Sequence, residues 1–288
     1  MSASDFGWAV KVMRVGYLGR TIVYLVLAGF SLWAIWHGGQ AEGTTSALAE
    51  LETTTGGGVV LALIALGMLA YAVWRGVDAL WDLEDYGSGG KGIVARGGMI
   101  VTGVTHLAIG FAAASLLFGG SGGSGDSSSG GSSITQAVGT IMSWPGGRWI
   151  IGIVGAITIA AGIFYAYKGY AEKYREHLRA NEFTMRWNLV LKIGLVAYGA
   201  VIAIVGLLLV YAALNANPEQ AGGVGEAFSW VSGQPYGRAL VAAICVGLIA
   251  FSIFCAVNAA YRIVPKAADE SIESMAARMK AQARAATS

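Results

Sequence analysis

Six long runs of apolar residues, separated by polar or glycine-rich segments, dominate the pattern of this 288-residue chain. An α-helix needs roughly 20 apolar residues to cross the hydrocarbon core of a bilayer, and each run is long enough to do so. The pattern therefore predicts an all-α integral membrane protein with six transmembrane helices. The six runs are residues 17–36, 59–80, 98–118, 149–170, 190–214 and 238–262.

Short motifs recur along the chain and divide the six runs into pairs. The first run of each pair opens with a basic residue that is followed, two positions on, by glycine. The second run follows a turn motif that repeats at intervals of 90 residues, which predicts three tandem two-helix repeats. The openings are Arg14-x-Gly16, Arg96-x-Gly98 and Lys192-x-Gly194, and the turns are Thr55-Gly56-Gly57-Gly58, Pro145-Gly146-Gly147-Arg148 and Pro235-Tyr236-Gly237-Arg238.

Each repeat has two spans, so it begins and ends on the same side of the membrane, and the three copies are parallel. Parallel copies are related by an axis along the membrane normal, and we predict a pseudo-threefold axis. Repeat 2 carries a glycine- and serine-rich insertion at 119–133 that lacks the lysine of a phosphate-binding loop. The predicted segments are repeat 1 at residues 12–85, repeat 2 at 92–180, repeat 3 at 186–265 and a cytoplasmic amphipathic tail at 266–288.

The connections between the paired spans contain apolar residues spaced three apart. This spacing predicts a short helix lying on the outer surface in each repeat. The positions in register are Leu48, Val138 and Phe228, followed by Leu51, Ile141 and Val231.

Two charged segments follow spanning helices. Residues 171–186 are predicted to extend the fourth spanning helix into the cytoplasm. The tail has apolar residues on one helical face, which favours either a helix resting on the inner leaflet or on a partner, or a frayed solvated end. Those apolar residues are Ile272, Met275, Met279 and Ala283.

Positive charge lies almost entirely on one side of this predicted topology. Of the 19 basic residues, 17 fall at the termini or in the connections between repeats. The three connections at 37–58, 119–148 and 215–238 contain only Arg148 and Arg238. By the positive-inside rule, both termini are cytoplasmic and these three connections face outward. Charged residues make up 12% of the chain and the net charge is +2, which does not suggest nucleic-acid binding.

The tandem repeats, the Arg/Lys-x-Gly openings and the Pro-x-Gly-Arg turns together resemble the bacterial family labelled domain of unknown function 1206. The resemblance covers residues 12–265, and repeat 1 departs from it with Thr55 in place of proline and Gly58 in place of arginine. It implies a location in the bacterial cytoplasmic (inner) membrane. It implies no activity, substrate or cofactor.

His106 is the strongest candidate for chemistry within the spans. It lies about nine residues into the third run, close to Thr102 and Thr105. An ionisable side chain at that depth suggests a proton relay or a ligand contact. The alternative, which we favour, is a neutral imidazole bonded to a nearby carbonyl or to Tyr24, its counterpart in repeat 1.

Other polar residues lie toward the cytoplasmic ends of the spans. Asp78, Lys168 and Asn258 share one register, so they converge if the second helices surround an axis. Asp78 and Lys168 could then pair, fixing the order of the repeats, or the three could form an inner gate. Arg20 and Arg75 are candidates for binding lipid headgroups, and simple snorkelling to the interface is the favoured alternative.

No catalytic residue, metal site or cofactor is predicted. His37, His106 and His177 lie at different depths, which argues against a bis-histidine haem, and no metal-ligand spacing is present. We therefore expect a non-enzymatic membrane scaffold or accessory subunit that contacts lipids, with its outer connections or its tail as candidate surfaces for a protein partner. A small-solute or ion transporter is the alternative, and a lipid- or quinone-active enzyme is the weakest hypothesis.

The predicted topology has a direct test. Alkaline phosphatase is active only after export, so fusions within 37–58 or 215–238 should be active and a fusion after Ser288 should be inactive. Activity of the terminal fusion, or inactivity of both loop fusions, would contradict the predicted orientation.

Overall fold

Six long helices form the body of the protein. The computed structural model describes residues 6–118, 130–267 and 273–285. Each long helix has the length and apolar composition to cross a membrane, which confirms the six predicted spans. Within the described ranges there is no β-strand, and only two isolated bridges pair extended backbone. The six helices are α1 (Gly7–Trp36), α3 (Gly57–Trp81), α4 (Gly90–Phe118), α6 (Gly147–Tyr170), α8 (Asn188–Asn215) and α10 (Gly237–Tyr261).

A short helix precedes the second spanning helix of each repeat, as predicted. These are α2 (Thr44–Thr53), α5 (Gly130–Met142) and α9 (Val224–Ser232), and the 3₁₀ turn η3 (Pro218–Gln220) precedes α9. Leu48, Val138 and Phe228 are all buried, so the shared register marks the face that packs inward. Residues 119–129 of the predicted glycine- and serine-rich insertion lie outside the described residues.

The repeated turn motif has a common backbone geometry. The residue before each second helix has a left-handed conformation, with φ of 82° at Gly56, 76° at Gly146 and 61° at Tyr236. The glycine that follows packs against the carbonyl end of the preceding short helix, where a Cβ atom would overlap the backbone. Glycine is the residue that accepts such close approach, which explains why this motif recurs.

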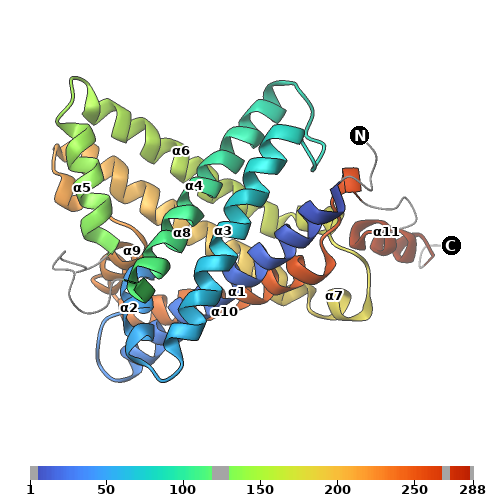
Figure 1. Ribbon diagram of the computed structural model, residues 1–288, viewed down its shortest axis with the longest axis horizontal. Helices are drawn as coiled ribbons and strands as arrows, with labels where there is room; N and C mark the ends of the chain where they lie inside the picture. Colours follow the sequence, from blue (N-terminus) through green and yellow to red (C-terminus); the bar gives the residue numbers. More distant parts are fainter. Residues whose placement is uncertain (1–5, 119–129, 268–272, 286–288) are drawn as a thin grey trace.

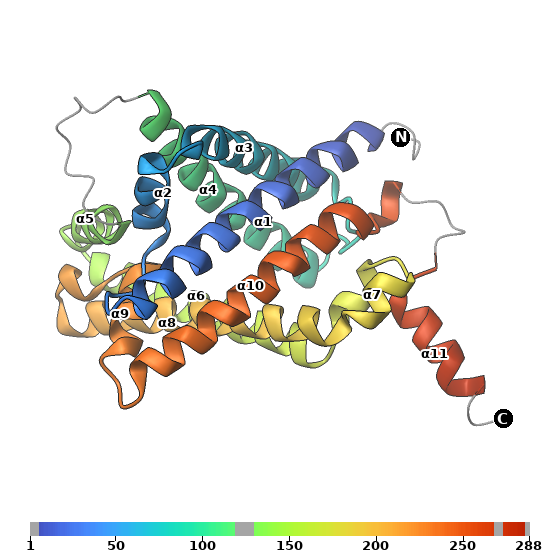
Figure 2. The ribbon, with the colours of Figure 1, turned by 90° about the horizontal axis from the view of Figure 1, so that it is seen from below.

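The long helices follow one another in a partly closed arrangement (Figures 1 and 2). Neighbours pack in the order α4, α3, α1, α10, α8 and α6. The two helices of repeat 1 pack together, as do those of repeat 3, whereas no extensive contact joins α4 to α6 of repeat 2. The pseudo-threefold axis therefore stays a prediction.

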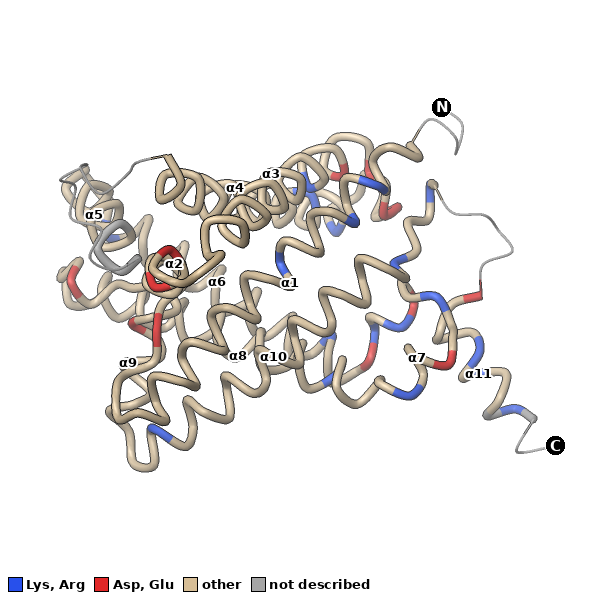
Figure 3. Tube along the Cα trace, turned by 60° about the horizontal axis from the view of Figure 1, so that its bottom comes forward, with Lys and Arg blue, Asp and Glu red and all other residues tan. Residues whose placement is uncertain are grey.

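The segments after α6 and α10 meet at one end of the molecule. They include η2 (Lys173–His177), α7 (Glu182–Arg186), η4 (Pro265–Ala267) and α11 (Met275–Ala285). The expected extension of the fourth span is wrong, because α6 ends at Tyr170 and Glu172 turns the chain with a φ of 57°. Lysine and arginine gather at this end (Figure 3).

The predicted amphipathic tail forms the helix α11. Its first residue, Met275, is fully buried and its amide donates to the carbonyl of Leu178 at 2.8 Å. The tail is thus attached to the connection between repeats 2 and 3. Ile272 and the side chain of Ala283 lie outside the described residues.

Glycine brings the helix axes close together. The helices α6 and α8 approach through Gly162 and Gly199, and a Cβ on Gly162 would lie 2.5 Å from the Ala203 nitrogen. Small residues at helix crossings allow the van der Waals contact that drives association in lipid.

Substitution of Gly162 tests this contact. Gly162→Ala should lower stability by roughly 1–3 kcal/mol, because the added methyl group overlaps backbone that cannot move freely. Gly76→Ala, at a helical position with open space around it, is the matched control. Thermal unfolding in mild detergent measures the stability of both purified variants against that of the unmodified protein. An equal response of the two variants would contradict the close-packing account.

Candidate functional site

A polar network is buried at the end of α3 and α10. It consists of Arg75, Asp78, Glu84, Asn258 and Arg262, and the first and third repeats meet in it. Arg75 Nη1 lies 3.1 Å from Asp78 Oδ2 and 3.6 Å from Glu84 Oε1. Arg262 Nη2 lies 2.6 Å from Glu84 Oε1, while its Nη1 donates to Asn258 Oδ1 at 2.7 Å. The network therefore fixes the end of α3 against the end of α10.

Asp78 does not form the expected ion pair with Lys168. The ion-pair partner of Asp78 is Arg75, which lies one turn earlier on the same helix. Lys168 enters none of the ion pairs found within residues 6–118, 130–267 and 273–285. The order of the repeats is held through Glu84 and Arg262 instead.

Glu84 and Arg262 were not anticipated from the sequence. Glu84 follows a turn at Asp82, whose φ of 53° directs the chain back toward the bundle. Burial alone would raise the pKa of Glu84, but the charges of Arg262, Arg75 and Lys168 outweigh it and hold the pKa well below its usual range. The sequence did offer one signal for this ion pair: Glu84 follows shortly after the span that ends at Trp81, and Arg262 follows directly after the span that ends at Tyr261.

Arg20 points into the protein, which corrects the favoured expectation that it snorkels to the interface. Only 5% of the residue is exposed, and Nη1 donates to the Tyr71 hydroxyl at 2.9 Å. Arg75 Nε donates to the same hydroxyl at 3.0 Å, so Tyr71 connects Arg20 to the polar network. Five rings surround the Arg20 guanidinium at 4.8–5.9 Å and form an aromatic cage. They are Tyr17, Tyr24, Tyr71, Tyr198 and Phe251.

Arg75 is also turned inward, with 12% of its side chain exposed. Its three partners, Tyr71, Asp78 and Glu84, all lie within the protein. The favoured snorkelling of Arg75 is therefore wrong as well, because internal acceptors satisfy its guanidinium.

His106 packs against Tyr71, which in turn bonds to Arg20 and Arg75. Its ring centroid is 4.6 Å from that of Tyr71, and only 3% of the residue is exposed. Nδ1 donates to the Thr102 carbonyl at 2.7 Å, because a carbonyl can only accept. Nε2 has no hydrogen-bond partner among the described residues. The hydroxyls of Thr102 and Thr105 donate to carbonyls of their own helix.

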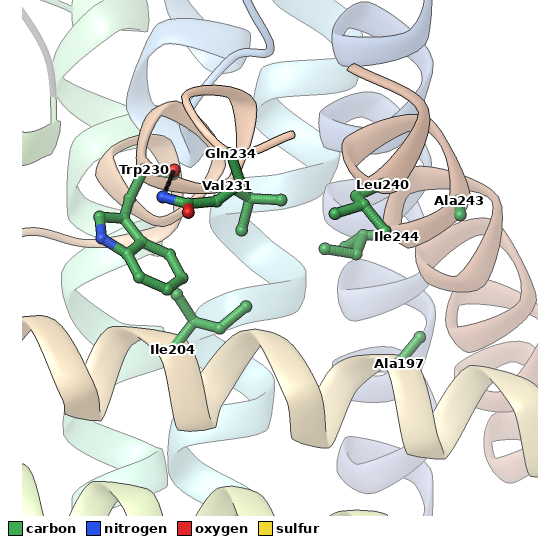
Figure 4. A pocket seen from close by; sticks show the side chains of 8 residues that line it. All are labelled: Ala197, Ile204, Trp230, Val231, Gln234, Leu240, Ala243 and Ile244. Atoms are coloured by element: carbon green, nitrogen blue, oxygen red, sulfur yellow. Dashed lines mark hydrogen bonds between the residues drawn. The ribbon is translucent and has the colours of Figure 1, made fainter. Parts of the chain in front are cut away.

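Two shallow surface pockets are lined by none of the residues of this polar network. The first has a volume of about 410 Å³ and is bounded by residues of α8, α9 and α10 (Figure 4). Its walls are apolar except near Gln234, whose side chain donates to the Trp230 carbonyl at 3.2 Å. The second pocket shares Ile204 and Trp230 with it. Such a surface suits hydrocarbon rather than a charged solute.

Metal chemistry has no evident position in the described part of the chain. No group of three or more histidine, cysteine, aspartate or glutamate side chains is close enough there to hold an ion. The two cysteines, Cys245 and Cys255, are separate, buried and free.

The fold and the polar centre define a polytopic α-helical membrane protein built from tandem two-helix units. The chain belongs to the family described as Domain of Unknown Function (DUF1206), whose family model matches residues 15–82, 97–172 and 193–262. These three matches confirm the predicted family and its three tandem repeats. A relative from Bacillus subtilis (strain 168), named "Uncharacterized protein YxxB", is 23% identical over 260 residues, or 88% of this chain and 92% of the relative. No solved structure matches.

The environment of His177, in η2, predicts that the stability of the protein depends on pH. Burial, aided by the charges of Arg262 and Lys168, lowers the pKa of His177 to about 4. An unfolded histidine takes up a proton below about pH 6.5, whereas folded His177 resists protonation until about pH 4. Stability should therefore fall by roughly 1–3 kcal/mol as the pH drops from 6.5 to 4.

The thermal unfolding midpoint across this pH range measures the effect. His177→Gln should flatten the profile between pH 6.5 and 4, and His37→Gln, at the exposed end of α1, is the control. A profile of His177→Gln that coincides with the unmodified protein would rule out His177 as the group responsible.

Proposed function

We propose that this protein is a non-enzymatic scaffold or accessory subunit of a membrane complex in the bacterial cytoplasmic membrane, with both termini in the cytoplasm. The gathering of lysine and arginine at the end that holds both termini supports this orientation (Figure 3). The six helices that are long and apolar enough to cross a membrane support the membrane location, and the relative from Bacillus subtilis supports a bacterial one.

The incomplete packing of repeat 2 carries the proposal. In α4 and α6, only 22% and 17% of the most apolar stretch is buried, compared with 56% in α10. Among the spanning helices, α4 packs extensively on α3 alone and α6 on α8 alone. These two helices therefore present most of their surface to whatever surrounds the protein.

The exposed surfaces of α4 and α6 contain residues that suit helix association. Thr105, Ala108 and Ser115 are exposed on α4, and Ala156 and Ala160 are exposed on α6. In lipid, small residues permit close approach and hydroxyl groups bond across helices, whereas a surface that meets only lipid needs neither. The partner we propose is a transmembrane helix of another protein.

The transporter hypothesis has weaker support. A transport path needs polar space next to the buried charges, and His106 is packed against Tyr71 instead. The two shallow pockets described above, one lined by α8, α9 and α10 and the other by α8 and α9, do not include His106. We therefore place the scaffold hypothesis first.

Site-specific cross-linking tests the proposed partner surface. Cys245 and Cys255 are fully buried, so an introduced cysteine becomes the reactive one. Ala108→Cys and Ala160→Cys, labelled in native membranes with a maleimide that carries a photoreactive group, should each give an adduct of one discrete protein mass. Val246→Cys is the control, because Val246 is 58% exposed on the well-packed helix α10.

The pattern of adducts decides the outcome. The same discrete adduct from α4 and α6, and its absence from α10, supports a specific partner. Lipid adducts alone, or equal protein adducts from all three positions, would overturn the scaffold proposal.

A further inference from the structure

The buried charges around Tyr71 do not balance. Three arginines, Arg20, Arg75 and Arg262, face two carboxylates, Asp78 and Glu84. Asp82 is buried as well, but it pairs with Arg96 and Lys266. Asp78 and Glu84 form ion pairs with Arg75 or Arg262. Within the described residues, no carboxylate lies within ion-pair distance of Arg20. An uncompensated charge is costly in a low-dielectric interior, so a bound anion would stabilise Arg20.

Arg20 also has unused hydrogen-bonding capacity. Its Nε is buried and has no acceptor among the described residues. Tyr71 cannot supply a second acceptor, because its oxygen already receives hydrogen bonds from both Arg20 and Arg75. The ring faces of the aromatic cage stabilise the cation, but no hydroxyl of the cage accepts a hydrogen bond from Nε. An oxyanion would meet this need, since a guanidinium binds carboxylate or phosphate oxygens through paired N–H groups.

At the positions that match Arg20 and Tyr71, repeat 2 has the smallest side chains. Counted from the Arg/Lys-x-Gly openings, Arg20 corresponds to Thr102 in repeat 2 and Tyr198 in repeat 3. At the 90-residue spacing, Tyr71 corresponds to Ala161 and Phe251. Repeats 1 and 3 thus supply large aromatic rings, whereas repeat 2 supplies a threonine and an alanine.

The side of repeat 2 is also the one where the helices do not close. Thr102 and Ala161 are half-buried, as is Tyr165, whose ring lies 5.3 Å from that of Tyr198. The helices α4 and α6 have no extensive contact with each other, so packing between them does not close this side.

We propose that Arg20 binds the oxyanion headgroup of a membrane amphiphile that enters between α4 and α6. The carboxylate or phosphate pairs with the free side of the guanidinium and balances the excess charge. The apolar tail lies along the exposed aliphatic residues of α4 and α6, such as Val104 and Ile157. Phospholipid and fatty acid share this chemistry and are distinguished by the test.

The test uses native mass spectrometry of the purified full-length protein with four separate probes. They are dioleoyl phosphatidylglycerol, dioleoyl phosphatidylcholine, oleate and inorganic phosphate. We expect one molecule of phosphatidylglycerol or oleate to bind at least about tenfold more tightly than phosphatidylcholine, because only the first two carry a net negative charge to offset that of Arg20. Whichever of the two binds identifies the source.

Arg20→Met should weaken this binding by at least about tenfold, since it removes a buried charge-assisted contact. Arg14→Met is the matched control, because Arg14 is an exposed arginine on the same helix and reports general attraction of anionic headgroups. Equal binding by the Arg20 and Arg14 variants would overturn the proposal. Inorganic phosphate binding as tightly as the amphiphiles would overturn the role of the tail.

A second pair of variants keeps Arg20 intact and serves if Arg20→Met does not fold. Ala161→Leu narrows the proposed entry and should reduce amphiphile binding, whereas Ala156→Leu, at an exposed position on the same helix, should not. Unchanged binding by Ala161→Leu in a protein that retains its unfolding temperature would exclude entry from this side.

Discussion

Close backbone contact at glycine is the constraint on which the rest of this structure depends. In hydrocarbon, burying an apolar side chain between two helices provides little driving force, because lipid tails are equally apolar. Association relies on van der Waals contact at short range, as between Gly162 of α6 and Gly199 of α8. The same property operates in the turns, where Gly57 packs against the short helix before it. The fold therefore uses glycine both for crossing and for turning.

The polar centre adds specificity to this packing. Glu84 and Arg262 lie 178 residues apart in the chain, and their ion pair joins the first repeat to the third. Breaking a buried pair by removing one partner costs about 3–5 kcal/mol, so the network discourages other orders of the helices. Tyr71 extends it to Arg20 and contacts His106. Tyr71 of α3 thus connects α1 and α4 to the buried charges of the polar network.

Divergence among the repeats is concentrated in the second one. Its register partners of Arg20 and Tyr71 are Thr102 and Ala161, and its two helices are the least buried of the six. Both proposals, a partner helix on the outer faces and an amphiphile on the inner side, follow from this departure.

The sequence by itself determined the elements that depend on local pattern. The span lengths, the short helix before each second span and the turn motifs all follow from hydrophobic period and glycine position, so they were predicted from residues such as Leu48, Val138 and Phe228. Only the tertiary structure decided where Arg20 and Arg75 point and that Asp78 pairs with Arg75, and it revealed the open side of repeat 2. Those outcomes depend on which nearby residue offers a hydrogen-bond acceptor or an opposite charge. Residues that are distant in the chain but close in space produce no periodic pattern in a single sequence, so the sequence could not predict these contacts.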